Sequence, residues 1–337
     1  MAKSLTFQTT GNTSVIIGTE ATMGTAAPED GSGATMEMPV TEFSFSETNL
    51  HSLSQAPLRT GTGGSNLSDD MVKWQKHDRM FEISMTFHAS ALAIDRVLLN
   101  MYEGAAENNV LLGSMPTTTD FTDAASNAIP VTLWFENAAH DGAGVDMYFT
   151  SCMCTSFSLA GDIASNGGVV MATATFVTAY PPVEAAFTLE ATSGANTLVT
   201  AHTTVFNMHD LIAAGTTLDG EDMLLYSFNL NIERPVNRIG FNAAAALKPQ
   251  GYSVGGYSVT GDLTVKRDGE IDDAIDNEAG MILDIDTSVY QILAPKVFVD
   301  AAGISFDDDG WKQTIPFVCT YDSAATSNPI ISIFTAA

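Results

Sequence analysis

The segment Phe81-Glu82-Ile83-Ser84-Met85-Thr86-Phe87 places a large apolar residue at every second position and a polar residue between them. Successive side chains of a β-strand point to opposite faces of a sheet, so this period of two predicts a strand with one buried face and one solvent-facing face. The same alternation recurs at Phe43 and Phe45, at Tyr226, Phe228, Leu230 and Ile232, and at Tyr257, Val259, Leu263 and Val265, where Gly261 interrupts it. Half-buried antiparallel strands are therefore expected, and the predicted fold class is mainly β.

Two short helices are predicted, each directly after one of these strands. The first spans roughly Ser90 to Tyr102, and Gly104 is placed to end it. Its inward face is formed by Ile94, Val97, Leu98 and Met101. The second spans about Asp268 to Ala279, with Asp268 as its candidate N-cap and Gly280 at its end. The order of strand and then helix thus occurs twice.

Ordered matches between the two parts of the chain indicate an internal repeat. The matches are Leu5–Thr10 with Phe187–Thr192 at an offset of 182, Phe43–Phe45 with Tyr226–Phe228 at 183, Tyr148 with Tyr290, Ala160–Gly161 with Ala302–Gly303 and Gly168 with Gly310 at 142, and Phe176–Val177 with Phe317–Val318 and Tyr180 with Tyr321 at 141. The fall in offset places a deletion in the second copy, opposite the first copy's loop from Gly104 to about Ala128. We therefore expect two tandem copies of one β-sandwich or barrel domain, residues 1–183 and 184–337, each with one short flanking helix.

The charge of the chain is strongly acidic. It has 40 Asp and Glu against 13 Lys and Arg, and its formal net charge is -27. Free nucleic acid would be repelled, because binding it needs a concentrated basic stripe and none is visible. A wall that DNA must slide past without sticking would benefit from such a charge, whereas solubility or life in salty water would explain it equally well. Charged residues are only 16% of the chain, and small weakly polar residues replace them, which favours a surface largely covered by partners.

Neither a leader peptide nor a membrane-spanning helix is expected. The N-terminal residues contain no apolar core of a signal peptide, and no run of 18 or more apolar residues occurs in the sequence. The three cysteines, Cys152, Cys154 and Cys319, are an odd number, and a bond between Cys152 and Cys154 would be sterically poor. We expect reduced, buried thiols.

The patterns that could carry chemistry fail on their context. Gly251-Tyr252-Ser253-Val254-Gly255 fits the G-x-S-x-G nucleophile elbow, but an alternating strand follows in place of a helix, and the last histidine, His209, precedes Ser253. The six histidines form no pair at metal-ligand spacing. The acidic clusters Asp268–Asp276 and Asp307–Asp309 lack the ligand pattern of a calcium loop and are interpreted as a solvated helix face and a turn. We expect no catalytic site, no metal and no cofactor.

Seven of the thirteen basic residues lie in or beside two loops that the repeat makes equivalent. Those of the first copy are Arg59, Lys73, Lys76 and Arg79, and those of the second copy are Arg234, Arg238 and Lys248. In an acidic protein, two equivalent basic loops would suit docking onto an acidic face of a neighbouring copy. The alternative is that surface loops are polar in any case. We interpret these residues as candidate inter-subunit docking loops.

Two segments resemble a known family. Ile16-Ile17-Gly18-Thr19-Glu20-Ala21-Thr22-Met23-Gly24-Thr25 resembles the opening of the tail tube proteins of long-tailed, siphovirus-like bacteriophages, in particular the subclass with a duplicated tube domain. Leu225 to Gly269, a strand, a long loop containing Gly255-Gly256, a strand and a short helix, is similar to the centre of the tube domain. The resemblance extends over most of the chain without a single diagnostic motif, and the loop from Gly61 to Ser68 has no counterpart in it.

The resemblance implies a structural role in the virion. The family has two packed β-sheets with a flanking helix, and its inner sheets join around a ring. Six tube domains complete such a ring, so a chain with two of them would form a homotrimer with pseudo-sixfold symmetry. Stacked rings would then form an open tube whose acidic lumen conducts the viral genome into the host.

The same resemblance implies the partners and the location. Beyond other copies of itself, the chain would contact the tape measure, tail terminator and baseplate or distal tail proteins, with double-stranded DNA as non-sticking cargo. It would fold in the bacterial host cytoplasm and would not insert into a membrane. Two alternatives stay open: another duplicated β-sandwich, such as a capsid decoration protein, adhesin or sugar-binding module, and an enzyme.

Overall fold

The structure, a computed structural model, describes most of the 337-residue chain. The described residues are 13–27, 35–48, 51–55, 72–76, 80–98, 100–101, 109–112, 130–137, 146–185, 205–210, 216–239, 249, 251–267, 271–272, 275, 279–286, 290–299, 303–307, 310–321 and 330–335.

The chain is mainly β, which confirms the predicted fold class. The strands of the first half are β1 (Thr13–Thr19), β2 (Met36–Met38), β3 (Val40–Thr48), β4 (His51–Gln55), β5 (Val72–Lys76), β6 (Met80–His88), β7 (Asn109–Leu112), β8 (Val131–Asn137), β9 (Met147–Asp162), β10 (Met171–Thr178) and β11 (Val183–Glu184). Those of the second half are β12 (Thr217–Leu218), β13 (Glu221–Asp222), β14 (Leu225–Glu233), β15 (Val236–Ile239), β16 (Gly251–Val254), β17 (Ser258–Lys266), β18 (Met281–Asp286), β19 (Tyr290–Val299), β20 (Gly303–Asp307), β21 (Gly310–Cys319) and β22 (Ile331–Thr335).

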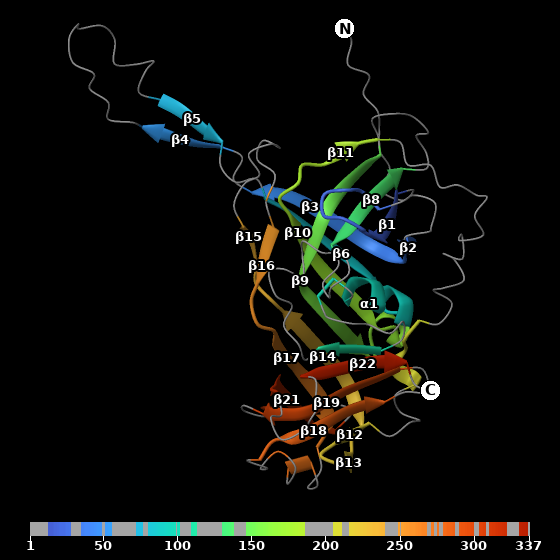
Figure 1. Cartoon of the computed structure of the whole chain (residues 1–337). Helices are drawn as coiled ribbons and strands as arrows, with labels where there is room; N and C mark the ends of the chain where they lie inside the picture. Colours follow the sequence, from blue (N-terminus) through green and yellow to red (C-terminus); the bar gives the residue numbers. More distant parts are fainter. Residues whose placement is uncertain are drawn as a thin grey trace, which may run out of the picture.

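One long sheet passes through both halves of the molecule (Figure 1). Its strands follow one another in the antiparallel order β3, β6, β10, β9, β14, β17 and β21. The first four strands come from the first half and the last three from the second. β9 and β14 pair over residues 156–162 and 227–233, so the sheet is continuous across the junction between the halves. We call this sheet the main sheet.

A second layer branches off at two strands, β9 and β19. In the first half, the C-terminal part of β9 pairs with β10 and β14, whereas its N-terminal part pairs with β8, and β8 in turn with β1. β9 changes layers near Ser151, whose φ of 51° lies in the left-handed region that residues other than glycine rarely adopt. In the second half β19 plays the same part, because it pairs first with β18 and β22 and then, from Val297, with β21.

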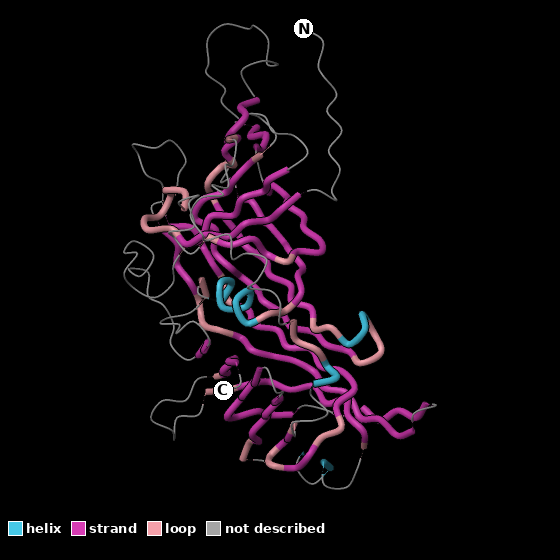
Figure 2. The backbone as a smooth tube through the Cα atoms, turned by 90° about the vertical axis from the view of Figure 1, so that its right-hand side faces the viewer, coloured by secondary structure: helices cyan, strands magenta, loops and turns pink. Residues whose placement is uncertain are grey.

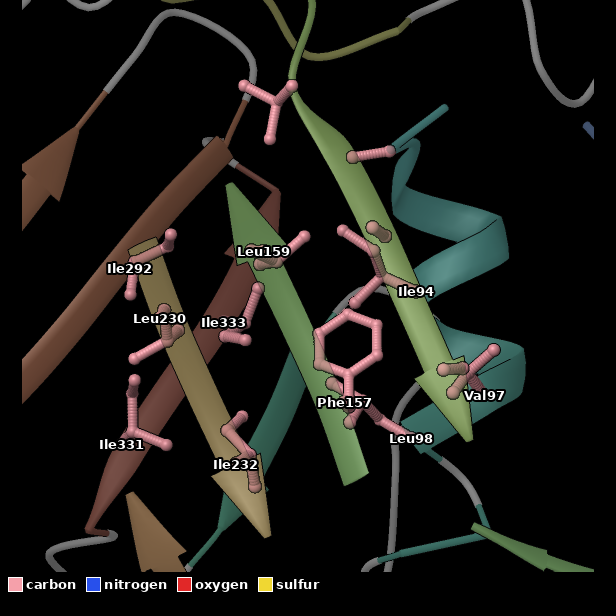
Figure 3. Packing of buried hydrophobic residues seen from close by; sticks show 14 of the residues in the cluster. Ile94, Val97, Leu98, Phe157, Leu159, Leu230, Ile232, Ile292, Ile331 and Ile333 are labelled. Carbon is pink, nitrogen blue, oxygen red and sulfur yellow. The ribbon is translucent and has the colours of Figure 1, made fainter. Parts of the chain in front are cut away.

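The hydrophobic core fills the space between the layers and under helix α1 (Ala91–Leu98). The four apolar residues of the Phe81–Phe87 segment are all buried, as the alternation predicted. Figure 3 shows Ile94, Val97 and Leu98 of α1 around Phe157 of β9, with Leu230 and Ile232 of β14 beside it. The core is therefore continuous across the junction between the halves. All three cysteines are free thiols and buried, as expected.

Both predicted helices occur where the structure describes them, but the first ends at Leu98 and not near Tyr102, because Asn100 and Met101 form a turn. The first one is α1, and Ser90 Oγ accepts a hydrogen bond from the N–H of Ala93 at its start. Of the second, residues 271, 272 and 275 are described and are helical. Figure 2 shows how little helix there is beside the strands. No helix in the described part of the chain is long and apolar enough to cross a membrane.

The prediction that Tyr226 faces inward is wrong. A β-bulge between Leu225 and Ser227 adds one residue to β14, which shifts the alternation by one position. Leu225 takes the buried position, and the ring of Tyr226 is left half-buried with Lys312 Nζ 4.5 Å from its centroid. Beyond the bulge Phe228 faces the core again, as predicted.

The break at Gly261 has a packing cause. Phe317 lies opposite Gly261 across β17 and β21, and its ring occupies the space of the missing side chain. A Cβ on Gly261 would lie 2.4 Å from Cζ of Phe317 and 2.3 Å from the carbonyl oxygen of Asn229. The glycine therefore lets a large aromatic residue enter the core from the neighbouring strand.

The pairing pattern of the first half recurs in the second. The bulge of β3, between Val40 and Glu42, has the same place as the bulge of β14. Each bulge lies opposite the C-terminal part of the partner strand, at Phe87 of β6 and at Val265 of β17. Corresponding positions are therefore separated by an offset of 185 residues between β3 and β14, and by an offset of 178 residues between β6 and β17. Domain duplication stays a prediction, and this recurrence supports it.

The recurring pairs also correct some predicted matches. Phe43 has the place of Phe228 and not that of Tyr226, so the expected offset of 183 is two residues short. The offset of 141 between Phe176 and Phe317 agrees with the pairing of β10 and β21. Ala160 of β9 lies opposite Met171, and Ser305 of β20 lies opposite Lys312. Since the offset of 141 relates Met171 to Lys312, Ala160 corresponds to Ser305 and not to Ala302. The alignment by residue similarity therefore had the wrong register at these positions, because short β segments resemble one another at several offsets.

The predicted first-copy loop from Gly104 to Ala128 contains a strand that belongs to the other half. Its β7 pairs with β22, the last strand of the chain, with Val110 opposite Ile333. Among the described residues, strand pairing joins the two halves by β9 with β14, by β7 with β22 and by the isolated bridges Ser90–Val205 and Val169–Asn207.

We predict that Gly261→Ala lowers the free energy of unfolding by about 1–3 kcal/mol, the usual cost of overpacking a core. The added methyl group would meet a backbone oxygen and an aromatic ring, and the backbone cannot yield easily. Urea unfolding followed by tryptophan fluorescence measures the change. Gly251→Ala is the matched control, because a Cβ there meets no atom within 4 Å. Equal stability of the two variants would contradict this account of Gly261.

Candidate assembly surfaces

The junction of β9 and β14 is an internal example of how two halves join edge to edge. Leu159 lies opposite Leu230, and Phe157 lies opposite Ile232. All four side chains are buried, and Leu159 is 0% exposed. Main-chain hydrogen bonds and an apolar row on the core face hold the two strands together, as in any strand added to a sheet edge.

The two ends of the main sheet have no such neighbour among the described residues. At one end β3 is hydrogen-bonded to β6 alone, and at the other end β20 extends the sheet beyond β21 and is hydrogen-bonded to β21 alone. Large apolar side chains are exposed at both ends: Phe45 of β3 is 48% exposed, and Ile304 and Phe306 of β20 are 50% and 67% exposed. Trp311 of β21, also exposed, stands against Phe306 with ring centroids 5.0 Å apart. Exposed apolar sheet edges mark places where another chain can pair.

The solvent face of the main sheet is polar and acidic. The polar residues on this face are Glu42, Ser44, Ser46, Glu82, Ser84, Thr86, Ser156, Ser158, Asp162, Thr173, Thr175, Ser227, Asn229, Asn231, Glu233, Thr260, Asp262 and Thr264. Five of these residues are acids. The same face also carries apolar residues, among them Met153, Val177 and Val318. The bases on the same face are Lys266 and Lys312, which lie opposite each other at one end of β17 and β21. We call this surface the polar face.

The loops predicted to carry the docking residues each contain a β-hairpin. In the first half β4 pairs with β5, and in the second half β15 pairs with β16 (Figure 1). Lys73 and Lys76 are on β5, and Arg238 is on β15. Arg59, Arg79 and Lys248 lie outside the described residues. Of the predicted docking residues, Lys73 and Lys76 thus lie on one hairpin and Arg238 on the other.

Arg234 does not lie on a docking surface, which corrects its expected role. Its guanidinium is buried and donates hydrogen bonds to the carbonyl oxygens of Cys154 (Nε, 3.2 Å), Met101 (Nη1, 2.8 Å) and Asn100. Met101 and Asn100 follow the last turn of α1, whose carbonyl groups carry partial negative charge. Arg234 therefore ties the second half to the first within one chain. Its position at the end of β14, beside Pro235, gave no sign of this.

The hairpin β15–β16 packs on the first half through Tyr252. Its side chain is fully buried and packs with Met153 and Val177, and the N–H of Ala179 donates to its hydroxyl (3.1 Å). Burial raises the pKa of Tyr252 above its ordinary value. The G-x-S-x-G motif thus lies on a strand of this hairpin, where a nucleophile elbow would need a sharp turn into a helix.

A buried carboxylate fixes the segment that follows β1, and the sequence pattern did not predict it. Glu20 accepts hydrogen bonds from Oγ1 of Thr132 (2.8 Å), from N–H and Oγ of Ser151 (2.6 and 3.0 Å), and from N–H of Gly24 (3.1 Å). Burial raises the pKa of the Glu20 carboxyl. Its partners lie at the bend of β9, so the carboxylate holds the point where β9 changes layers. No group of His, Cys, Asp or Glu able to hold a metal ion occurs among the described residues.

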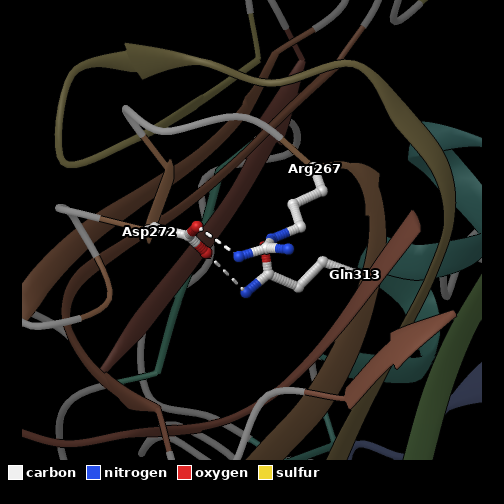
Figure 4. Close-up of polar contacts among 3 residues, drawn as sticks. All are labelled: Arg267, Asp272 and Gln313. Carbon is white, nitrogen blue, oxygen red and sulfur yellow. Dashed lines mark hydrogen bonds and ion pairs between the residues drawn. The ribbon is translucent and has the colours of Figure 1, made fainter. Parts of the chain in front are cut away.

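A contrasting arginine lies at the surface of the second half. Arg267 Nη2 lies 3.0 Å from Oδ2 of Asp272, and Gln313 Nε2 donates to the other carboxylate oxygen at 3.1 Å (Figure 4). The hydrogen bond from Arg267, with that from Gln313, lowers the pKa of Asp272. Both charged side chains of this pair are partly exposed, so water competes for the ion pair.

Comparison with known proteins gives one family. A family model described as phage tail tube protein matches residues 8–317 and so includes both halves. No curated protein matches the chain.

We predict that Arg234→Met lowers the free energy of unfolding by about 3–5 kcal/mol, because three buried carbonyl groups lose their charged donor. Met has a similar length and fills the space of the apolar part of the arginine side chain. Arg267→Met is the matched control and should change stability by a small fraction of that amount. Urea unfolding measures both. If the two variants lose equal stability, Arg234 does not tie the halves together.

Proposed function

The chain belongs to the phage tail tube protein family, and on this premise we propose that it is the repeating subunit of a tail tube, built from stacked homotrimeric rings with pseudo-hexameric symmetry. As a member of this family the chain is a structural protein of the virion. Its role in the proposal is architectural and not enzymatic. Chains join edge to edge around the ring, and the tube conducts the viral genome during ejection.

The observation that carries the proposal is the correspondence between the inner junction and the free edges. β3 occupies the position in the first half that β14 occupies in the second. β20 is the neighbour of β21 in the sheet, as β9 is the neighbour of β10. Transferring the register of β9 and β14 to β20 and β3 puts Ile304 opposite Phe45 and Phe306 opposite Phe43. These positions include the apolar side chains that are exposed at both ends. The pairing of two copies would bury them as Leu159 and Leu230 are buried within one chain.

The proposed number of chains rests on the resemblance to tube proteins with a duplicated domain. If six tube domains complete a ring and each chain supplies two, three chains close it. Each chain then contributes one internal junction, between β9 and β14, and shares one junction with the next chain, between β20 and β3. Internal and external junctions alternate, which is the origin of a pseudo-sixfold ring made by three identical subunits.

The polar face supports the proposed lumen. A sheet that closes into a ring turns one face inward, and the other face already covers the core. The inward face would therefore carry the small polar side chains and the five acids of the polar face. Phosphates of DNA would be repelled by this charge, so the genome would pass without sticking.

The family also supports the proposed location and partners. Tail tube subunits lie in the virion, and this chain would fold in the cytoplasm of the bacterial host before assembly. Its partners would be further copies of itself and the other tail proteins, which are the tape measure, terminator and baseplate or distal tail proteins. Double-stranded DNA would be cargo and not a bound ligand.

We predict that the purified protein forms hollow rings or tubes in negative-stain electron micrographs, and that Ile304→Asp prevents ring formation. The substitution places a charge at the centre of the proposed β20–β3 junction, where it would be buried beside Phe45. Ile282→Asp is the matched control, because Ile282 is 49% exposed on β18, away from both edges of the main sheet. It should form rings like the unmodified chain. Ring formation by the Ile304 variant would contradict the proposed junction.

We also predict that lysines on the polar face retain DNA. The triple variant Glu82→Lys, Glu233→Lys and Asp262→Lys, assembled with short linear duplex DNA and treated with nuclease, should protect more DNA than the unmodified protein.

The control carries the same change of charge elsewhere on the exposed surface, at Glu184→Lys, Glu221→Lys and Asp222→Lys. DNA attracted to the outside of a tube remains open to the nuclease, so this variant should protect no more than the unmodified protein. Equal protection by both variants would contradict the assignment of the polar face to the lumen.

A further inference from the structure

We propose that the hairpin β4–β5 of each chain docks on the second half of a neighbouring copy, with Trp74 over the pair Phe298 and Val318. This inference rests on the proposed function, because it needs chains that join edge to edge. It goes further by assigning an occupant to a second apolar surface, separate from the strand edges, and a partner to the β4–β5 hairpin.

The chain itself contains a complete example of this contact. Tyr252 of the hairpin β15–β16 is buried against Met153 and Val177, which lie directly opposite each other on β9 and β10. Val236 and Val254 of the same hairpin pack beside them. The hairpin of the second half is thereby fastened to the half that precedes it along the main sheet.

The same surface exists on the second half and lies open. Phe298 of β19 and Val318 of β21 are directly opposite each other, as Met153 and Val177 are. Their places in the pairing pattern are the same, since Val177 and Val318 follow Phe176 and Phe317. Met153 is 0% exposed, whereas Phe298 is 37% and Val318 44% exposed. No hairpin covers these positions in the described part of the second half, and Lys296 Nζ lies 5.7 Å from the centroid of the Phe298 ring.

The hairpin β4–β5 has the matching residues. Positions of β3 and β14 correspond at 185 residues and positions of β6 and β17 at 178. Extended into the hairpins, these offsets place Leu53 where Arg238 lies and Trp74 where Tyr252 lies. The register agrees, because Leu53 lies opposite Trp74 and Arg238 opposite Tyr252. An aromatic residue is therefore present at the one hairpin position that anchors the internal contact.

The change from Tyr to Trp also fits the receiving surface. In the internal contact the tyrosine hydroxyl accepts a hydrogen bond from the N–H of Ala179. An indole N–H can only donate. The residue in the place of Ala179 is Thr320, whose N–H already donates to Lys296 and whose buried Oγ1 has no hydrogen-bond partner among the described residues. The atom has no exposed surface in the single chain, so an indole N–H would bond to it only after the Thr320 side chain turns outward.

The position of the hairpin along the sheet makes another copy the partner. The hairpin β15–β16 follows β14, and it packs on the half whose β9 pairs with β14. The hairpin β4–β5 follows β3, which is the free end of the main sheet. Among the described residues β3 pairs with β6 alone, so we assign the equivalent surface to the second half of a neighbouring copy. Hairpin and strand edge would then bind the same neighbour at once.

Disulfide trapping tests the inference. Trp74→Cys is combined with Val318→Cys, and the assembled protein is oxidised mildly and separated on a non-reducing gel. Because the three native thiols are buried, the new pair is the accessible one. We expect covalent dimers and trimers that disappear on reduction. The matched control is Gln75→Cys with Val318→Cys, because neighbouring residues of a strand face opposite sides, and it should give mainly monomer.

Assembly and trapping are scored separately. Rings without cross-linked oligomers, or oligomers formed equally by the control, would overturn the docking site and leave the tube proposal intact. A disulfide within one chain would also overturn it. If the unmodified chain forms no rings, the proposed function itself fails. As a second measurement, Trp74→Ala should raise the protein concentration needed for half-maximal ring formation at least tenfold, whereas Gln75→Ala should leave it unchanged. Equal concentrations for both would contradict the inference.

Discussion

The architecture depends on the pairing of a single long strand, β9, with strands of both halves and of both layers. Its 16 residues give hydrogen bonds to β8 at one end and to β10 and β14 at the other. A strand can change layers in this way only if its backbone turns sharply, and Ser151 does so at a φ that is costly for serine. The buried carboxylate of Glu20 accepts the N–H and Oγ of that residue and so stabilises the turn. The continuity of the main sheet and of the core follows from this one strand.

A sheet built in this way ends in two unlike edges. β14 covers β9 within the chain, but the corresponding edge, β20, carries exposed Ile304 and Phe306, and the opposite end carries exposed Phe45. The same contrast holds for the hairpin surfaces, where Met153 is covered and Phe298 is open. Within one chain these surfaces of the first half are covered, whereas the equivalent surfaces of the second half are exposed. Such a chain is suited to head-to-tail contacts with copies of itself, and these contacts can close into a ring.

The charged residues show how far the candidate site could be predicted. Lys73, Lys76 and Arg238 lie on two hairpins, whereas Arg234, which was expected at a docking surface, is buried. Loop position alone suggested an exposed side chain, whereas three carbonyl groups from the first half accept its hydrogen bonds. Those acceptors come from residues about 80 to 134 positions earlier, a separation at which a local pattern carries no information. The docking role of the remaining bases stays a prediction.

The sequence by itself determined the mainly β fold class, the alternation that divides apolar from acidic positions, the first helix and the family resemblance, because each depends on neighbours within a few residues. It also indicated a repeat, yet it placed Phe43 against Tyr226, and the bulges and cross-strand pairs place it against Phe228. Tertiary structure decided the strand register, the junction of β9 with β14, the pairing of β7 with a strand of the second half and the burial of Arg234. These features depend on which distant strands share hydrogen bonds, and period-two patterns fit many partners equally well until the core and the bulges select one.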